Sequence, residues 1–183
     1  MNKIYYSLLI LIISQFSFSQ KQQNASVEKS LFGLQIGTLG AWTHNEFKIS
    51  NEFSLRSEIG INFGMIGGSI HNGTTLISAP SFSLEPRWYY NLVERATKNK
   101  NTSKNSADFL TLGVTYFPNV NTQKYNITSQ LTFIPKWGIK RTLGDHFTYE
   151  AGFGLGYVVF LDKNYTSNKN LIADLHLRLG YTF

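Results

Sequence analysis

The sequence predicts an all-β protein: a single antiparallel up-and-down transmembrane β-barrel with eight strands. Two observations carry this prediction. Apolar side chains recur at every second position over most of the chain, and the amino terminus has the composition of an export signal. The alternation is most regular in the closing run, whose apolar positions are Leu171, Ala173, Leu175, Leu177, Leu179, Tyr181 and Phe183.

The amino terminus predicts secretion. Lys3 gives a positive start, residues 4–13 are largely apolar, and Ser17 and Ser19 supply the small side chains that a signal peptidase accepts. The apolar stretch is much shorter than the roughly 20 residues that a spanning helix needs. We therefore expect a cleaved signal peptide at 1–20, a periplasmic leader at 21–29 and the barrel at 30–183.

Composition excludes several classes of function. The chain has no cysteine, so disulfides, thiolate metal sites and a lipid-modified cysteine are impossible. Its formal charge of +6 is spread over strands and loops without a basic helix or a nucleic-acid motif, and we expect no nucleic-acid partner. After residue 20 no stretch approaches 18 consecutive apolar residues, so a membrane would be crossed by strands.

The first strand region begins at residue 30. Its alternation places Phe32 on one face and Gly33 on the other, and we assign Trp42 to the face of Phe32 and Ala41 to that of Gly33. Residues 53–65 then alternate phenylalanine, leucine and isoleucine with serine, arginine and glutamate, which is too regular for a helix.

Two further strands follow, each after a polar connection. Glycine and small polar residues at 67–75 predict a loop, after which residues 76–90 alternate bulky apolar side chains with serine, glutamate and arginine. The longest polar connection is basic and covers residues 93–108, which we expect to be a solvated, mobile loop; contact with anionic lipid or cell wall is the alternative. Residues 110–116 form the next strand.

The last part of the chain repeats the arrangement. A polar loop at 119–129 precedes a strand at 130–141, and a tight turn with Gly144 and Asp145 leads to a strand at 147–160 that alternates bulky residues with glycine. Loop 161–170 leads to the final strand at 171–183.

This pass gives seven strands, whereas bacterial barrels normally have an even number. A hairpin resolves the difference, with strands at 30–36 and 40–49 around a turn at 37–40. A strand within 21–30 or a seven-stranded sheet are the alternatives. Pro80, Pro86 and Pro135 fall inside predicted strands, where each removes a ladder donor, so we expect bulges or strand ends there.

The direction of the strands divides the loops between two ends. With Phe183 at the periplasmic side, loops 67–75, 119–129 and 161–170 lie outside the cell. Turns 50–52 and 142–146 and the connection 92–108 then lie in the periplasm.

Alternation alone does not say which face is inside, because a soluble lipocalin-like barrel has the same period. Only 15% of residues are charged, and the polar strand positions are rich in glycine, serine and threonine, which suits a narrow lumen. Aromatic residues, also 15%, gather near strand ends, as expected of headgroup-level bands; an aromatic core is the alternative. The periplasmic band contains Trp42, Phe47, Phe53, Trp88, Tyr90, Phe147, Tyr149, Tyr181 and Phe183, and the outer band Phe63, Tyr116, Tyr157 and Phe160.

The polar face predicts a charged interior in which acids and bases pair and leave no continuous water path. Signs alternate, as at Arg56 and Glu58, whereas a selective pore concentrates one sign. The predicted lumen network consists of Arg56, Glu58, Glu85, Arg87, Lys136, Lys140, Glu150, Asp174, His176 and Arg178.

The closing LHLRLGYTF and the segments EFKISNEFSLRSEIG and HFTYEAGFGLGY resemble those of the small outer-membrane β-barrel proteins of Gram-negative bacteria, described as porin-like β-barrel domains. The resemblance implies an outer-membrane location, contact with outer-membrane lipid, and recognition by the barrel-assembly machinery. That assembly signal would be carried by Leu177, Leu179, Tyr181 and Phe183. It implies no single activity.

No residue pattern indicates an enzyme, cofactor or metal site. The nearest candidate is a lipid A esterase-like hydrolase in which His71 would act with Ser69 or Ser78, but an acid would have to come from another loop, such as Asp162. His44 and His146 fall near predicted turns. We expect an outer-membrane barrel with a structural or interaction role; a small-solute channel and, less favoured, a lipid-modifying hydrolase are the alternatives.

Overall fold

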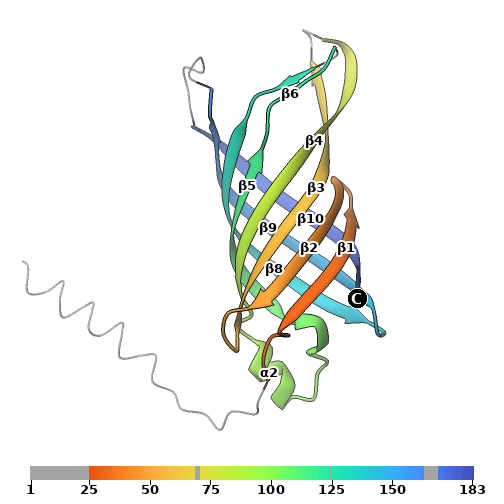
Figure 1. Ribbon diagram of the computed structural model, residues 1–183, viewed down its shortest axis with the longest axis vertical. Helices are drawn as coiled ribbons and strands as arrows, with labels where there is room; N and C mark the ends of the chain where they lie inside the picture. Colours follow the sequence, from red (N-terminus) through yellow and green to blue (C-terminus); the bar gives the residue numbers. More distant parts are fainter. Residues whose placement is uncertain (1–24, 69–70, 124, 163–168) are drawn as a thin grey trace, which may run out of the picture.

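The protein forms a closed antiparallel barrel of eight long strands, as the alternation predicts (Figure 1). The structure, a computed structural model, describes residues 25–68, 71–123, 125–162 and 169–183. The predicted signal peptide and the first residues of the leader lie outside these ranges. Around the barrel the order is β1-β10-β9-β8-β5-β4-β3-β2, so strands that follow each other pair and the first pairs with the last.

The barrel strands are β1 (Ser30–Gly37), β2 (Gly40–Lys48), β3 (Phe53–Gly68), β4 (His71–Trp88), β5 (Asp108–Phe117), β8 (Gln130–Leu143), β9 (Phe147–Phe160) and β10 (Lys169–Thr182). Between β5 and β8, the short strands β6 (Val120–Asn121) and β7 (Asn126–Ile127) form a separate hairpin. The connection from β4 to β5 contains α2 (Leu92–Thr97) and the 3-10 helix η2 (Ser103–Asn105).

The hairpin expected near the amino terminus supplies the eighth strand. β1 and β2 are joined by Thr38 and Leu39, with Gly37 opposite Gly40. Because this turn has two residues, the inward positions change from odd in β1 to even in β2. Our placement of Trp42 is therefore wrong: its side chain is buried in the interior, and Ala41 faces outward.

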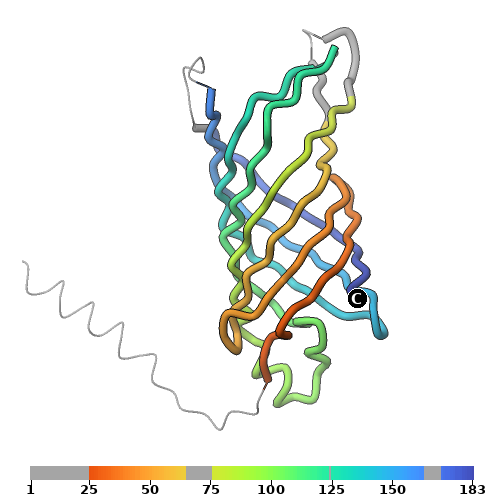
Figure 2. The backbone as a smooth tube through the Cα atoms, viewed as in Figure 1, coloured from red at the N-terminus to blue at the C-terminus, as the bar shows by residue number. Residues whose placement is uncertain are grey.

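The loops divide between the two ends of the barrel as the strand directions predict (Figure 2). The turns after β2 and β8, the α2 connection and Phe183 lie at the lower end, and the β1–β2 turn and the β6–β7 hairpin point to the other. The upper hairpin contacts β4, since the Tyr125 hydroxyl donates to the Ser78 carbonyl at 3.2 Å and the Ser78 amide donates back to it at 3.2 Å.

The prolines interrupt ladders without shifting their register. The β4–β5 ladder skips Pro86 between the pairs Leu84↔Val114 and Arg87↔Thr111. The β8–β9 ladder skips Pro135 in the same way. The predicted bulges are therefore wrong at Pro86 and Pro135, because each proline still pairs with its other neighbouring strand and only one donor is lost. Pro80 lies beyond the last β4–β5 pair, as a strand end would.

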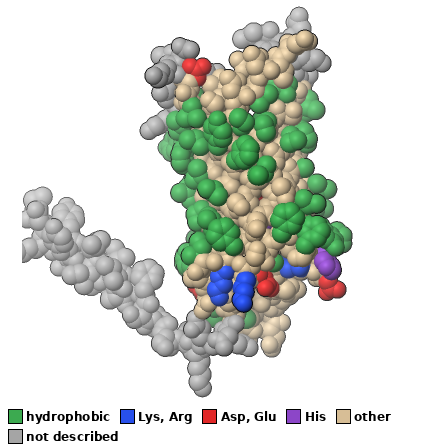
Figure 3. Space-filling view, viewed as in Figure 1, with side chains coloured by type: hydrophobic (Ala, Val, Ile, Leu, Met, Phe, Trp, Pro, Cys, Tyr) green, Lys and Arg blue, Asp and Glu red, His purple; other side chains and the backbone are tan. Residues whose placement is uncertain are grey.

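The outer surface of the barrel is apolar and its inner surface is polar. Leu34, Ile61, Leu84, Leu155 and Leu177 are half or more exposed, from five different strands. Figure 3 shows such side chains covering the visible wall, with charged residues gathered mainly at the lower rim. Within the described part of the chain, no helix has the length and apolar character that spanning a membrane requires.

Candidate functional site

The interior of the barrel is the only part of the described chain where many charged side chains are buried together. Alternation directs one face of every strand inward. The structure joins nine of the ten predicted lumen residues through one set of ion pairs, while Lys140 pairs separately with Glu46. Eight of them are buried: Arg56, Glu58, Glu85, Arg87, Lys136, Lys140, Glu150 and His176. Asp174 and Arg178 keep side-chain exposures of 25% and 10%.

Glu150 on β9 is the centre of this network. Arg87 binds it with two donors, Nη1 to Oε2 at 3.0 Å and Nη2 to Oε1 at 2.8 Å. Arg56 approaches the same carboxylate at 3.5 Å and donates from Nη2 to Glu58 at 2.5 Å. Arg87 also donates to Glu85 at 2.6 Å. These pairs connect β3 and β4 to β9 across the lumen.

A second group of contacts lies above Glu150. Arg178 on β10 donates to Glu58 at 2.7 Å, and its guanidinium stacks over the Trp42 ring at 4.0 Å. Lys136 forms a very close ion pair with Glu85 and lies 3.5 Å from Asp174. His176 lies 3.4 Å from Asp174 and 3.5 Å from Glu150.

Some pairs lie within one strand, as Arg56 with Glu58 does, but others join opposite walls of the barrel. Lys140 stands directly opposite Glu150 in the β8–β9 register, yet its ammonium bonds to Glu46 on β2 at 3.0 Å. Such contacts fix the distance between walls. A buried ion pair adds little net stability, but removing one partner strands a charge, which typically costs about 3–5 kcal/mol.

Glu46 is a central residue that the sequence prediction missed. Its carboxylate accepts from Lys140, from Ser54 at 2.8 Å, from the Tyr89 hydroxyl at 2.8 Å and from Asn105 at 2.7 Å. Burial and the Glu46 charge raise the pKa of Tyr89, which keeps its hydroxyl protonated as a donor. The sequence pattern could have identified Glu46, because the even-numbered positions of β2 all face inward. Glu46 shares this parity with Trp42, the residue that we placed on the wrong face.

The connection between β4 and β5 closes the lower end of the barrel. Our expectation of a solvated loop at 93–108 is wrong in part: residues 97–101 are exposed, but the segment contains two short helices and residues 105–107 are buried. Asn105 is buried, and besides its bond to Glu46 it accepts from the Glu28 amide at 2.7 Å. Phe109 lies under Arg87, whose guanidinium carbon is 4.3 Å from the ring centre. We call this α2–η2 segment, with residues 25–29 packed against it, the end cap.

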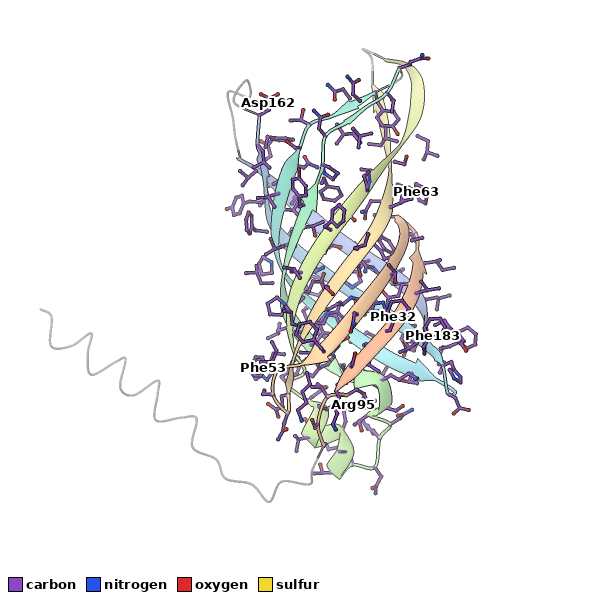
Figure 4. The ribbon with its side chains drawn as sticks, viewed as in Figure 1. Phe32, Phe53, Phe63, Arg95, Asp162 and Phe183 are labelled. Carbon is purple, nitrogen blue, oxygen red and sulfur yellow. The ribbon has the colours of Figure 1, made fainter. Side chains whose placement is uncertain are left out.

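The end cap has an apolar core of its own, made of Val27, Tyr89, Leu92, Ala107 and Phe109. Polar contacts around this core connect the end cap to β5 and β8. Asn91 and Asp108 bond to each other twice, both at 2.8 Å, and Arg141 on β8 pairs closely with Asp108. Arg95, labelled in Figure 4, donates to the Ser106 carbonyl at 2.8 Å. The basic side chain of Arg95 thus serves the cap's internal structure.

The residues of the predicted assembly signal lie on the outer face of β10. Leu177, Leu179, Tyr181 and Phe183 all point away from the lumen and are 37–64% exposed. Phe183 stacks with Phe32 at 5.6 Å, and its amide donates to the Phe32 carbonyl at 2.9 Å. Their recognition during assembly stays a prediction.

The described residues show no arrangement of serine, histidine and acid that would support the hydrolase hypothesis. Ser69 and the His71 side chain lie outside the described residues, and the Ser78 hydroxyl lies 3.3 Å from that of Tyr125. His146 lies at a turn and stacks on Tyr181, whereas our placement of His44 near a turn is wrong, since its ring is buried in the lumen. Among the described residues, no three histidine or acidic side chains gather as a metal site would require.

We predict that Glu46→Gln lowers the free energy of unfolding by about 3–5 kcal/mol, because Lys140 would lose its counter-charge in a buried position. Denaturant unfolding of the purified protein in detergent measures the change. Glu94→Gln is the matched control, since it breaks the exposed pair with Lys98 on α2 and should leave stability unchanged. Equal stability of the two variants would contradict a structural role for the Glu46 contacts.

Comparisons with protein-family models, with curated proteins and with solved structures found no match for this chain. The barrel, its paired interior and its end cap are therefore the basis for any functional proposal.

Proposed function

We propose that this protein is an integral outer-membrane β-barrel with a structural or interaction role, whose interior is a rigid, charge-paired filling. The inverted distribution of side chains carries the proposal. Charged residues are buried inside the barrel, while leucine, isoleucine and phenylalanine cover its outside. Soluble proteins rarely expose continuous apolar surface on this scale, whereas a bilayer favours it.

Aromatic side chains near both ends of the strands support the same proposal. At the lower end, exposed aromatics include Phe53, Trp88, Tyr90, Phe147, Tyr181 and Phe183. Their polar atoms find partners there, since the Trp137 indole donates to the Tyr90 hydroxyl at 2.9 Å. Phe63, Tyr116 and Tyr157 are exposed towards the other end. Rings with one apolar and one polar side favour the headgroup level.

A scaffold role is favoured over a solute channel because two separate features obstruct the lumen. The network around Glu150 crosses the middle of the barrel, and the end cap lies across its lower end. An eight-stranded barrel is only just wide enough for its own side chains. Outer-membrane lipid and, during biogenesis, the barrel-assembly machinery are the proposed partners.

Membrane fractionation combined with gel migration tests the location. We expect the protein in the detergent-extracted outer-membrane fraction, and we expect the unheated form to migrate differently from the boiled form, because a closed barrel resists unfolding by detergent. Recovery in the soluble periplasmic fraction would overturn the proposal.

Replacing an outward leucine with arginine tests whether the outer wall of the barrel faces lipid or water. Leu155 is 62% exposed near the middle of β9, and Leu143 is 50% exposed at the end of β8. In lipid vesicles, Leu155→Arg should cost about 2–4 kcal/mol of unfolding free energy, and Leu143→Arg about 0–1 kcal/mol, because the penalty depends on depth. Equilibrium unfolding in vesicles measures both. A water-exposed wall would instead tolerate the two substitutions equally.

We also predict that the purified protein shows no steady conductance in planar bilayers, because ion pairs and the end cap obstruct the lumen. Parallel recordings use the wild-type protein and the Glu46→Gln variant. Neither should show current, because the ion pairs around Glu150 still cross the lumen in the variant. Reproducible unitary currents from the wild-type protein would favour the channel alternative.

A further inference from the structure

The wall of the barrel is much lower on one side than on the others. Pairing between β1 and β10 ends at Gly37↔Arg178, and pairing between β2 and β3 ends at Gly40↔Asn62. β10 continues up to Lys169 and β3 up to Gly68, each paired with its other neighbour. In Figure 1 the β1–β2 hairpin accordingly ends well below the tips of β3 and β4. Among the residues that the structure describes, this leaves a lateral notch above Leu39, between β10 and β3.

A cavity of about 200 Å³ lies beside this notch, above the ion-pair network. We call it the vestibule; residues that line it include Leu39, Trp42, Asn62, Lys136, Asp174 and Leu177. The lining is mixed: Leu39 in the hairpin turn is apolar, Ile134 on the opposite wall is apolar too, and β10 contributes the charged Asp174. An apolar residue at the notch and charged residues farther in therefore belong to one cavity.

Asp174 is the charged group that the vestibule leaves accessible. Its side chain is 25% exposed, whereas those of Lys136 and Glu58 are 5% and 3% exposed. Its basic neighbours are also distant, with His176 at 3.4 Å and Lys136 at 3.5 Å. Glu58, by contrast, accepts from two arginines at 2.5 and 2.7 Å. The Asp174 carboxylate thus retains capacity to accept hydrogen bonds from a ligand.

Three basic side chains line the vestibule, and each already faces a carboxylate. His176 lies 3.4 Å from Asp174 and 3.5 Å from Glu150; its Nε2 and the Nε of Arg178 have no hydrogen-bond partner, but both atoms are buried. Lys136 forms its close contact with Glu85, and Arg178 is bound by Glu58 while its guanidinium stacks on Trp42. A ligand anion would therefore compete with buried carboxylates, whereas a cation would meet an accessible one. Charge complementarity selects a cationic head group.

We propose that the vestibule binds a small amphiphile that carries a protonated amine. The amine donates to the Asp174 carboxylate, and the apolar part passes Leu39, leaves through the notch and reaches Leu177 on the outer face of β10. This assigns a ligand class to a protein whose proposed role is otherwise structural. The same chemistry is available from an amine-bearing lipid in the membrane or from a free alkylamine in the medium.

The first experiment measures binding to the purified full-length barrel in micelles of an uncharged detergent. Calorimetric titration with octylammonium should show saturable binding, and octanoate and octanol should bind much more weakly. Asp174→Asn should weaken octylammonium binding by about 10- to 100-fold, the worth of a charge-assisted hydrogen bond. Asp145→Asn, in the turn at the far end of the barrel, is the matched control and should bind like the wild type.

Heat-modifiable migration verifies that each variant is folded.

Thr38→Trp provides a second test that leaves the network intact, because Thr38 is an exposed turn residue at the vestibule. The larger ring should narrow the entrance and weaken octylammonium binding. Octylammonium affinity that is unchanged in both Asp174→Asn and Thr38→Trp, or equal affinity for octanoate, would overturn the proposal.

A second experiment distinguishes the sources of the amine. The protein is reconstituted in phosphatidylcholine vesicles that contain a photoreactive hexadecylammonium probe, and butylammonium is titrated separately as a soluble probe. Labelling near Leu39 and Leu177 that is lost in Asp174→Asn supports the proposal with a membrane ligand. Binding of butylammonium alone, also dependent on Asp174, supports it with a soluble ligand. Absence of both would refute it, whatever the protein's membrane location.

Discussion

Pairing of charge across the lumen is the constraint on which the rest of the barrel depends. Five carboxylates face five bases in the described interior: Glu46, Glu58, Glu85, Glu150 and Asp174 with Arg56, Arg87, Lys136, Lys140 and Arg178. A single unpaired member would be buried at high cost. Slipping any strand by one residue would turn its charges outward and its apolar side chains inward. The network therefore selects the register of every strand that contributes to it.

The end cap completes this interior instead of adding a separate domain. Glu46 needs four donors, and two of them, Tyr89 and Asn105, come from the connection between β4 and β5. The apolar core around Phe109 keeps those donors in place beneath Arg87. At the opposite end, charge pairing among the described residues stops at Asp174, and a cavity of about 200 Å³ lies there. In the described part of the chain, the two ends of the lumen are thus built differently.

Period-two alternation predicted seven strands and the inward placement of residues such as Arg87 and Glu150, and the even strand number of bacterial barrels indicated the hairpin that holds the eighth. It failed where the period is interrupted. The two-residue turn at Thr38 and Leu39 reverses the inward parity, so Trp42 was placed outside and Glu46 was missed. The end cap could not be predicted because residues 93–108 have no periodic pattern, and its apolar core is drawn from Val27, Leu92 and Phe109, which are distant in sequence. Ladder gaps at prolines depend on which neighbour each amide faces, which composition does not reveal.

The seam that closes the cylinder has a consequence for the order of assembly. Its pairs run from Gly33↔Thr182 to Gly37↔Arg178, and join the first strand of the barrel to the last. Every other ladder of the barrel joins strands that are consecutive among the eight and close in sequence, but this one spans nearly the whole chain. Until β10 pairs with it, β1 keeps one unsatisfied edge, which other strands could pair with. By its sequence separation, closure of the barrel is therefore expected to be a late event.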